Sequence, residues 1–130
     1  MSRPLIYIDT SEVHEGALEE LRGAIAELAD FVETNEPELI SYNVYFSDDG
    51  SRMTVMHMHP NSASLDFHMD VAGPLFGRFA GLLTLQSIDI YGEPSDKALA
   101  QLRDKVELLG SAEVTVHPLH AGFSRFGRAE

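Results

Sequence analysis

The spacing of apolar residues along this chain changes between a period of two and a period of three to four, and the order of these changes restricts the fold. A period of two predicts strands, whereas a spacing of three to four predicts helices with one apolar face. The predicted strands lie at about 5–9, 39–46, 52–59, 87–91 and 113–119. The predicted helices lie at about 11–35, 62–72, 74–83 and 95–109.

The order of these elements is β-α-β-β-α-β followed by one more α-β pair, which predicts a ferredoxin-like α+β domain. The length of 130 residues suits a single domain. Side chains that can cap a helix stand where the helices are expected to begin. These capping candidates are Thr10 or Ser11, then Asn61 or Ser62, and finally Ser95.

Each predicted strand has one aliphatic-rich face and one face that mixes polar and aromatic residues. The aliphatic faces carry Ile6, Ile8, Ile40, Val44, Phe46, Met56, Met58, Ile88, Ile90, Val114 and Val116. The mixed faces carry Tyr7, Asp9, Asn43, Tyr45, His57, His59, Asp89, Tyr91, Thr115 and His117. We expect the helices to cover the aliphatic face. The mixed face holds three of the four tyrosines and is expected to contact a second subunit, with a water-facing sheet as the alternative.

Composition and charge narrow the classes of partner. The net charge of −12 disfavours nucleic acid and anionic membrane surfaces. The absence of cysteine excludes disulfides and thiolate chemistry. No apolar run approaches the ~20 residues of a membrane helix, and the first ten residues lack the features of a secretory signal. A cytoplasmic location is the expectation.

The segment VMHMHPNSASLDFHMD contains three of the six histidines. His57 and His59 are two residues apart on a strand, a spacing compatible with a metal ion such as Zn²⁺. His68 lies on the helical stripe that faces the sheet, and the predicted faces put the sheet between it and the other two. We therefore expect no metal site, with a site formed by His57 and His59 at a subunit interface as the alternative.

Two interpretations of His68 follow from its place on an otherwise apolar stripe. It is either a core histidine with ordinary hydrogen-bond partners, or the polar group of a pocket for a flat aromatic ligand. In the second interpretation the imidazole takes a phenolic proton and produces an anion that reacts with O₂. The predicted pocket is lined by Tyr42, Phe46, Met56, Met58, Leu65, Phe76 and Phe79.

Several weak motifs in this order resemble an antibiotic-biosynthesis-monooxygenase (ABM)-like domain. They are Glu36-Pro37 at a helix end, a tyrosine-containing strand at 42–46, the acidic turn Asp48-Asp49-Gly50, and a helix containing His68. The resemblance implies a core at about 5–92 and an α-β extension at about 93–120 within one domain of residues 1–130. It also implies a homodimer in which two sheets face each other as an α+β barrel, and activities such as cofactor-independent oxidation of quinols and anthrones or haem degradation.

The chain departs from the resemblance at specific positions. Similar sequences often have a glutamate and a large aromatic residue where this chain has His57 and His59. Haem degradation is disfavoured because the chain has no tryptophan and has Arg78 where the haem ligand is expected. The resulting hypothesis is a protein that binds a small apolar or aromatic molecule and oxidises it without a cofactor, with His68 as catalytic base and Tyr42 as second polar contact. The alternative is a non-catalytic dimeric binding or accessory protein, so whether the chain is an enzyme stays open.

Overall fold

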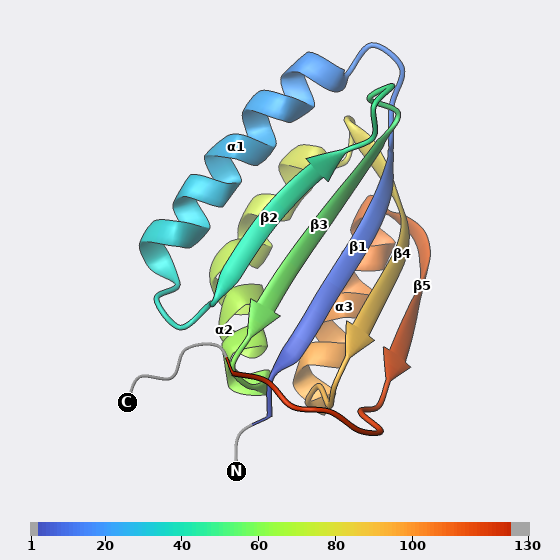
Figure 1. The fold of residues 1–130 in the computed structure, drawn as a ribbon. Coiled ribbons are helices and arrows are strands. Elements are labelled where there is room, and N and C mark those ends of the chain that lie inside the picture. Colours follow the sequence, from blue (N-terminus) through green and yellow to red (C-terminus); the bar gives the residue numbers. More distant parts are fainter. Residues whose placement is uncertain (1–2, 126–130) are drawn as a thin grey trace.

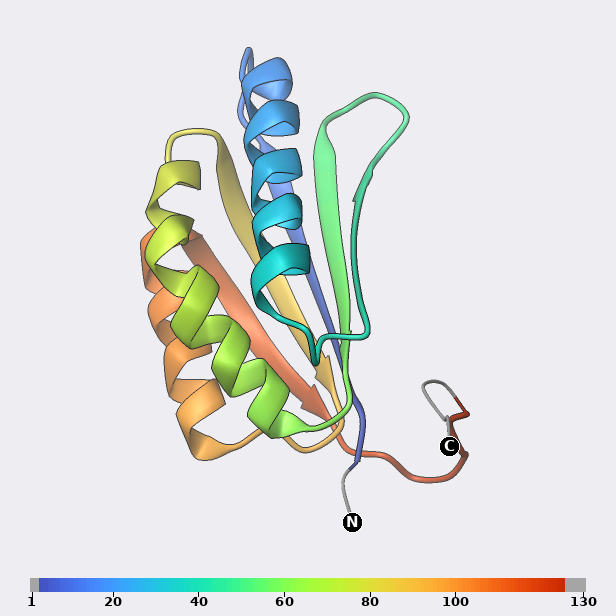
Figure 2. The ribbon, with the colours of Figure 1, turned by 90° about the vertical axis from the view of Figure 1, so that its left-hand side faces the viewer.

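The computed structural model describes residues 3–125 and consists of one five-stranded sheet with helices on one face (Figure 1). In chain order the elements are β1 (Leu5–Val13), α1 (Leu18–Asn35), β2 (Ser41–Phe46), β3 (Arg52–His59), α2 (Ser62–Ala72), the 3₁₀ helix η1 (Gly73–Phe79), β4 (Leu83–Tyr91), α3 (Asp96–Leu109) and β5 (Gly110–His117). The side view separates a helical layer from the sheet (Figure 2). The predicted ferredoxin-like α+β fold with an added α-β pair is confirmed.

The strands are arranged in the order β2-β3-β1-β4-β5, so β1 lies at the centre of the sheet. β1 is antiparallel to both of its neighbours, β3 and β4. The C-terminal strand β5 is parallel to β4, and α3 makes the crossover between them (Figure 1). The C-terminal extension therefore adds one edge strand and one helix to the same core. No helix among residues 3–125 has the length and apolar character needed to cross a membrane.

The predicted faces of β1 and β3 are wrong, because the helices cover the opposite face of these two strands. Tyr7 and Asp9 on β1 are buried, and so are His57 and His59 on β3. Their neighbours on the other face are only partly buried; these are Ile6, Ile8, Met56 and Met58. The predicted faces of β2 and β4 are correct, since Val44, Phe46, Ile88 and Ile90 lie on the helix side.

The pairing of the strands explains the error. Residues directly opposite each other in an antiparallel pair share a face, and Tyr7 is opposite both His57 and Ile90. Ile8 is opposite Asp89, which faces away from the helices. Aliphatic content alone therefore assigned β1 to the wrong face, because a shift of one residue in register exchanges the two faces of a strand.

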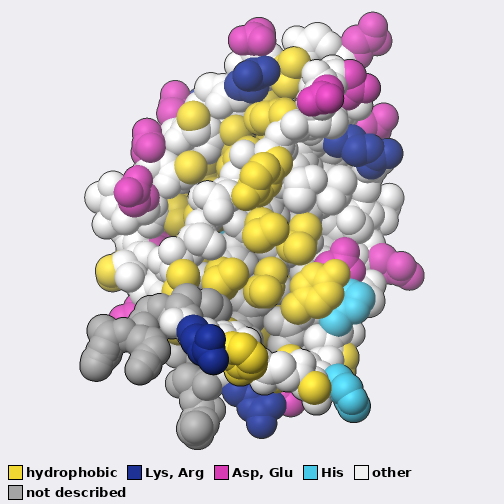
Figure 3. Space-filling view, viewed as in Figure 1, with side chains coloured by type: hydrophobic (Ala, Val, Ile, Leu, Met, Phe, Trp, Pro, Cys, Tyr) yellow, Lys and Arg dark blue, Asp and Glu magenta, His cyan; other side chains and the backbone are white. Residues whose placement is uncertain are grey.

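The outer face of the sheet is consequently more apolar than expected. Figure 3 shows hydrophobic side chains gathered over the strands, with most acidic groups around the edge. The exposed members include Tyr45, opposite Thr54, and Tyr91, opposite Ile6. The partly exposed aliphatic and methionine side chains of β1 and β3 lie between them.

The first helix begins later than expected. β1 continues to Val13, where it pairs with Leu83, so Thr10 and Ser11 are strand residues and do not cap α1. β4 likewise begins at Leu83 and not at Ser87. Each of these strands pairs with two neighbouring strands, and this pairing extends it beyond the segment in which apolar and polar residues alternate.

The other two predicted caps are confirmed. The side chain of Asn61 accepts a hydrogen bond from the backbone N–H of Ser64 at the start of α2. The hydroxyl of Ser95 accepts one from the N–H of Ala98 at the start of α3. These bonds set the first turns of the two helices that carry much of the buried polar chemistry.

Gly110 connects α3 directly to β5 and packs against the backbone of β4. A Cβ atom at this position would collide with the carbonyl oxygen of Leu85 and would lie 2.8 Å from its nitrogen. Its φ of 169° is extended, so the requirement for glycine is one of space. The close approach allows the parallel pairing of β4 and β5 to begin at the helix end.

Replacing Gly110 by alanine is expected to destabilise the protein by about 1–3 kcal/mol, because backbone atoms of β4 have to move. Gly23→Ala is the matched control, since Gly23 lies in the exposed part of α1 and an added Cβ would meet no atom within 4 Å. That change is expected to stabilise by about 0.5–1 kcal/mol. Urea denaturation of both variants checks the pair, and equal effects would contradict the packing argument.

Candidate functional site

An unusual number of titratable side chains lie buried between the sheet and the helices. They are Tyr7, Asp9, Glu36, His57, His59, His68 and Lys105, each at most 9% exposed. Burial disfavours charge, so such groups are kept only when they are paired or used. Clusters of this kind are typical of functional sites. The cluster spans β1, β3, α2 and α3 and reaches the end of α1.

Lys105 forms the centre of the first part of the cluster. Its ammonium group donates to the hydroxyl of Tyr7 at 2.7 Å and to the carboxylate of Asp9 at 3.2 Å. The Tyr7 hydroxyl in turn donates to Asp9 at 2.5 Å. The Lys105 nitrogen also lies 4.4 Å from the ring centroid of Phe76. A buried ammonium and a buried carboxylate therefore compensate each other beside an aromatic wall.

A histidine chain forms the second part. Nδ1 of His57 lies 3.0 Å from Nε2 of His59, and Nδ1 of His59 lies 2.8 Å from the Ser64 hydroxyl. Ser64 is held in place because its backbone N–H donates a hydrogen bond to the side chain of Asn61, the N-cap of α2. The strand alternation puts both rings on one face, and each ring uses a nitrogen to orient the other.

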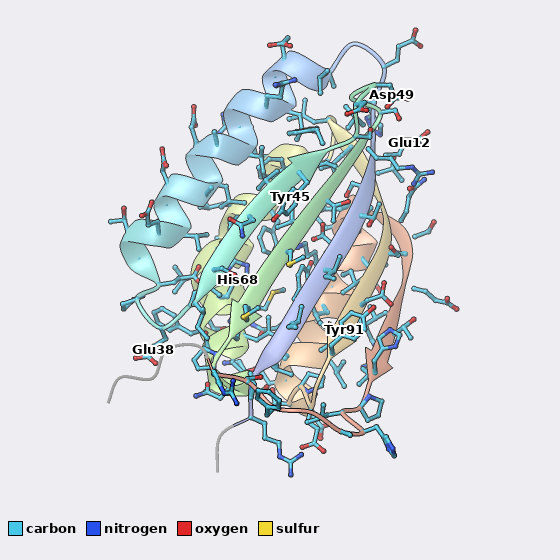
Figure 4. The ribbon with its side chains drawn as sticks, viewed as in Figure 1. Glu12, Glu38, Tyr45, Asp49, His68 and Tyr91 are labelled. Atoms are coloured by element: carbon cyan, nitrogen blue, oxygen red, sulfur yellow. The ribbon has the colours of Figure 1, made fainter. Side chains whose placement is uncertain are left out.

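His68 and Glu36 form the third part. Nδ1 of His68 lies 2.9 Å from each oxygen of the Glu36 carboxylate, and both side chains are buried. A carboxylate at Nδ1 favours the tautomer in which Nδ1 carries the proton and Nε2 accepts. Among residues 3–125, no hydrogen bond engages Nε2 of His68. Figure 4 shows His68 on the helix side of the sheet.

Ring contacts join the three parts into one cluster. Tyr7 stacks on His57 with centroids 4.0 Å apart, and His57 meets His68 edge-on at 4.6 Å. Tyr42 lies 5.0 Å from His57 and 5.8 Å from His68. The expected separation of His68 from His57 and His59 by the sheet is therefore wrong, because all three lie on the same side.

Burial controls the protonation of the cluster. Desolvation lowers the pKa of His57 well below its usual value, and the neighbouring His68 and His59 lower it further. Desolvation, with a contribution from His68, lowers the pKa of His59 to about 3. Desolvation and the Asp9 carboxylate raise the pKa values of Tyr7 and Tyr42. At neutral pH the site therefore holds neutral His57 and His59 rings and protonated phenols.

A small cavity of about 30 Å³ adjoins the cluster. Its polar wall consists of Asp9, Ser11, Tyr42 and Lys105. The remaining wall is apolar and includes Ile25, Leu28, Met53, Val55, Phe76, Phe79, Leu83, Leu85 and Leu109. Tyr42 and Glu36 also line a groove of about 400 Å³ between α1 and β2. Tyr42 thus contributes to the inner cavity and to the outer groove.

The predicted pocket residues divide into three groups. Tyr42, Phe76 and Phe79 line this cavity. Leu65 and Phe46 lie on the helix side without lining this cavity. The prediction is wrong for Met56 and Met58, which lie on the outer face of the sheet together with Ile6 and Ile8.

The predicted metal candidates His57 and His59 hydrogen-bond to each other. Within residues 3–125, no group of three or more histidine, aspartate or glutamate side chains is arranged to hold a metal ion. The ring nitrogens of His57 and His59 are engaged by each other and by Ser64. This arrangement suits proton transfer better than the binding of a metal ion.

Four site residues were not identified from the sequence: Tyr7, Asp9, Glu36 and Lys105. A signal existed for Lys105, because α3 buries Ala98, Leu102, Lys105 and Leu109, so a lysine occupies the apolar stripe. The apolar spacing predicts a stripe of Leu99, Leu102, Val106 and Leu109. Leu102 and Leu109 are buried as predicted, but the buried face continues through Ala98 and Lys105 in place of Leu99 and Val106. Tyr7 and Asp9 were recognised as a strand face but assigned to the wrong side.

Several solved structures share this fold. MupZ from Pseudomonas fluorescens matches with a TM-score of 0.74 and 17% sequence identity, over 98% of this chain and 99% of that chain. SnoaB, a cofactor-independent oxygenase from Streptomyces nogalater, matches with a TM-score of 0.61 and 14% identity, over 72% of this chain and 96% of that chain. A candidate antibiotic biosynthesis monooxygenase from Deinococcus radiodurans matches with a TM-score of 0.60 and 17% identity, over 70% and 93% respectively. No family model and no curated protein sequence matches the chain.

These similarities confirm the ABM-like resemblance at the level of the fold. The sequence identities are too low to transfer an activity. The match with MupZ spans 98% of this chain and therefore extends through α3 and β5. The match with SnoaB leaves more than a quarter of this chain uncovered.

The buried neutral histidines predict a specific loss of stability in acid. The unfolded chain protonates His57 and His59 near pH 6.5, whereas the folded chain resists protonation because their pKa values are lowered. Their contribution is fully present above that pH and is lost as pH falls below it, by up to about 1.4 kcal/mol per pH unit for each ring. Urea denaturation between about pH 7 and about pH 5 measures this slope.

The control is the double variant His57→Gln/His59→Gln, which has no imidazole at either position. Its free energy of unfolding is expected to vary much less over the same pH range, and the single variant His59→Gln is expected to show an intermediate slope. An unchanged slope in the double variant would show that other groups cause the acid sensitivity.

Proposed function

We propose that the chain is a cofactor-independent oxygenase for a small aromatic compound with an acidic hydroxyl or methylene group, such as a hydroquinone or an anthrone. The observation that carries the proposal is the buried Glu36–His68 pair, in which a carboxylate orients an imidazole. His68 does not line the cavity itself, but its ring lies behind two residues of the cavity wall, Tyr42 and Phe76. The shared fold with SnoaB, a cofactor-independent oxygenase, supports it.

His68 acts as the base in this proposal. Glu36 holds the proton on Nδ1 and stabilises the imidazolium that forms when Nε2 takes a proton from the substrate. His57 stays neutral beside it because its pKa is lowered by burial, so the proton remains on His68. The low-dielectric surroundings favour transfer between oriented groups over exchange with water.

The substrate anion then supplies the electrons for O₂. In an anthrone, the ring methylene becomes a carbonyl group, one oxygen atom of O₂ enters that carbonyl, and the other leaves as water. The substrate itself is the reductant, so this reaction needs neither a metal nor an organic cofactor. The role of the protein is to bind the ring, remove the proton and hold the anion.

Entry of a ring requires a change in the wall of the cavity. A volume of about 30 Å³ is roughly the share of one water molecule. Tyr42 separates this cavity from the larger groove by the end of α1, because its side chain forms part of the wall of each. A rotation of Tyr42 toward the groove would join the two spaces and place the substrate between Phe76 and His68.

The competing proposal is a non-catalytic binding protein on the same fold. The small volume of the closed cavity favours it, because a permanently closed site would admit no aromatic ring. A binding protein would be thermally stabilised by its ligand without forming a product.

The first experiment measures oxygen uptake by tag-free protein with a panel of hydroquinones and anthrones, without added cofactor. Replacing His68 by alanine is expected to lower the catalysed rate by about 10²–10⁴-fold because the base is removed. Glu36→Gln is expected to lower it by about 10–100-fold because the ring loses its orienting charge. The exposed His120 provides the control, and His120→Ala is expected to retain the rate.

Uptake that is equal in wild type and His68→Ala would reject His68 as the base. Thermal stabilisation by a panel compound without oxygen uptake would favour the binding protein. Both measurements use the same protein and the same compounds, so the two functions are separated directly.

We also propose that two chains pair through the outer face of the sheet as an α+β barrel. Ile8 and Met56 are opposite each other at the centre of this face and are partly exposed, with further apolar side chains around them. Most acidic side chains lie at the edge of the face, where they repel a second copy least (Figure 3). The ABM-like fold supports the arrangement.

Met56→Lys is expected to convert a dimer to a monomer, because it places a charge in the centre of the proposed contact. Sedimentation analysis should find twice the chain mass of 14.4 kDa for the wild type and the single mass for the variant. Glu107→Lys puts the same residue on the exposed surface of α3 and should remain dimeric. A wild type that is monomeric at every concentration would reject the dimer.

A further inference from the structure

We infer that Lys105 is the anion-binding group of this cavity and that the ligand it selects carries an oxygen that becomes negatively charged, a phenolate or an enolate. The inference deepens the proposed function and rests on it for the identity of the ligand. It assigns a role to α3, the helix that the C-terminal extension adds to the core.

Lys105 occupies a position where an apolar side chain would be expected. It is 9% exposed and lies on the apolar stripe of α3 between Leu102 and Leu109, which are both buried. Burying a lysine as an ion has a large desolvation cost, and a leucine or methionine would fill the same stripe without that cost. The cation therefore has a use that an apolar residue cannot meet.

The ammonium group of Lys105 has three N–H donors. Among residues 3–125, two of these donors are engaged, by the Tyr7 hydroxyl and by one oxygen of Asp9. Lys105 also lines the cavity, where Asp9, Ser11 and Tyr42 are the other polar residues. One donor is thus left for a ligand oxygen.

The surroundings of the ammonium hold it in a fixed orientation. Asp9 compensates the positive charge, and Tyr7 donates its proton to Asp9, so its hydroxyl oxygen accepts from Lys105. Burial and Asp9 raise the pKa of Tyr7, which keeps the phenol protonated. The nitrogen is further placed over Phe76 at 4.4 Å. These contacts leave the ammonium oriented before the ligand arrives.

The position of Lys105 complements that of the proposed base. Phe76 contacts both groups, with its ring centroid 6.1 Å from that of His68 and 4.4 Å from the Lys105 nitrogen. A flat ring lying against Phe76 can give a proton to one group and present its oxygen to the other. A neutral ligand without an ionisable hydroxyl would leave the buried ammonium without this partner.

The test uses 4-nitrophenol, a chromophore whose absorption reports its ionisation, bound to the intact chain. The wild type is expected to bind the phenolate about 10–100-fold more tightly than Lys105→Met does, since a charge-assisted hydrogen bond is lost. The pH at which the bound probe ionises should be lower in the wild type than in the variant. Nitrobenzene, which lacks the hydroxyl, should bind both proteins equally.

Further variants guard against misfolding. Lys105→Met leaves Asp9 buried and unpaired, so Asp9→Asn/Lys105→Met removes both charges and keeps the shape. This double variant should fold and still fail to favour the phenolate, whereas Lys105→Arg should restore part of the preference. Lys97→Met is the matched control, because Lys97 lies on the same helix, exposed, and pairs with Asp70.

An equal phenolate preference in wild type and in the double variant would overturn the inference, as would a wild type that does not bind the phenolate. Binding of 4-nitrophenol that requires Lys105, together with no oxygen uptake on the panel of hydroquinones and anthrones, would reject the oxygenase and retain the anion site. Oxygen uptake that requires His68 and is unaffected in the double variant would retain the oxygenase and reject the anion site.

Discussion

The antiparallel pairing of β1 with β3 places Tyr7 directly opposite His57, and it determines that Asp9 and His59 face the helices as well. It turns Asp9 toward α3 and His59 toward the first turn of α2, where Lys105 and Ser64 meet them. A register shifted by one residue would bury the isoleucines of β1 and expose the polar groups to water. At the centre of the sheet, the polar side chains of β1 are therefore buried and its isoleucines are only partly buried.

That interior is stable because nearly every group in it has a partner. Among the described residues, Oε1 of Gln101, outside the cluster, is the only fully enclosed side-chain nitrogen or oxygen without a hydrogen bond. Within the cluster, Nε2 of His68 accepts no hydrogen bond from the residues described. The histidine rings remain neutral, and the one buried ammonium within residues 3–125 faces a carboxylate. A polar core in which nearly all groups are paired is rigid. Removing one partner leaves the others buried without a hydrogen bond, which costs much free energy. Rigid and desolvated groups are also what proton chemistry requires.

Much of the fold, but less of the site, could be predicted from the sequence. The stripe of α1, the caps Asn61 and Ser95 and the order of elements depend on local chemistry, which a sequence displays. The faces of β1 and β3 depend on which strand lies beside them, and Tyr-Ile-Asp and Met-His-Met segments alternate equally well either way. Glu36 could not be joined to His68 from sequence, since 32 residues separate them. Lys105 had a local signal, because it lies between Leu102 and Leu109 on the buried face of α3, but the predicted stripe passed through Val106.

The separation of Lys105 from Asp9 in the chain has a consequence for folding. The two residues are 96 positions apart, so their ion pair closes a loop that includes most of the molecule. Contacts of such long range form late, after the entropy of closing the loop has been overcome. The central strand can pair with its neighbours earlier, but its carboxylate stays uncompensated until α3 docks. Docking of α3 therefore supplies Lys105 and Leu109 to the wall of the cavity and compensates the charge of Asp9 in the same step.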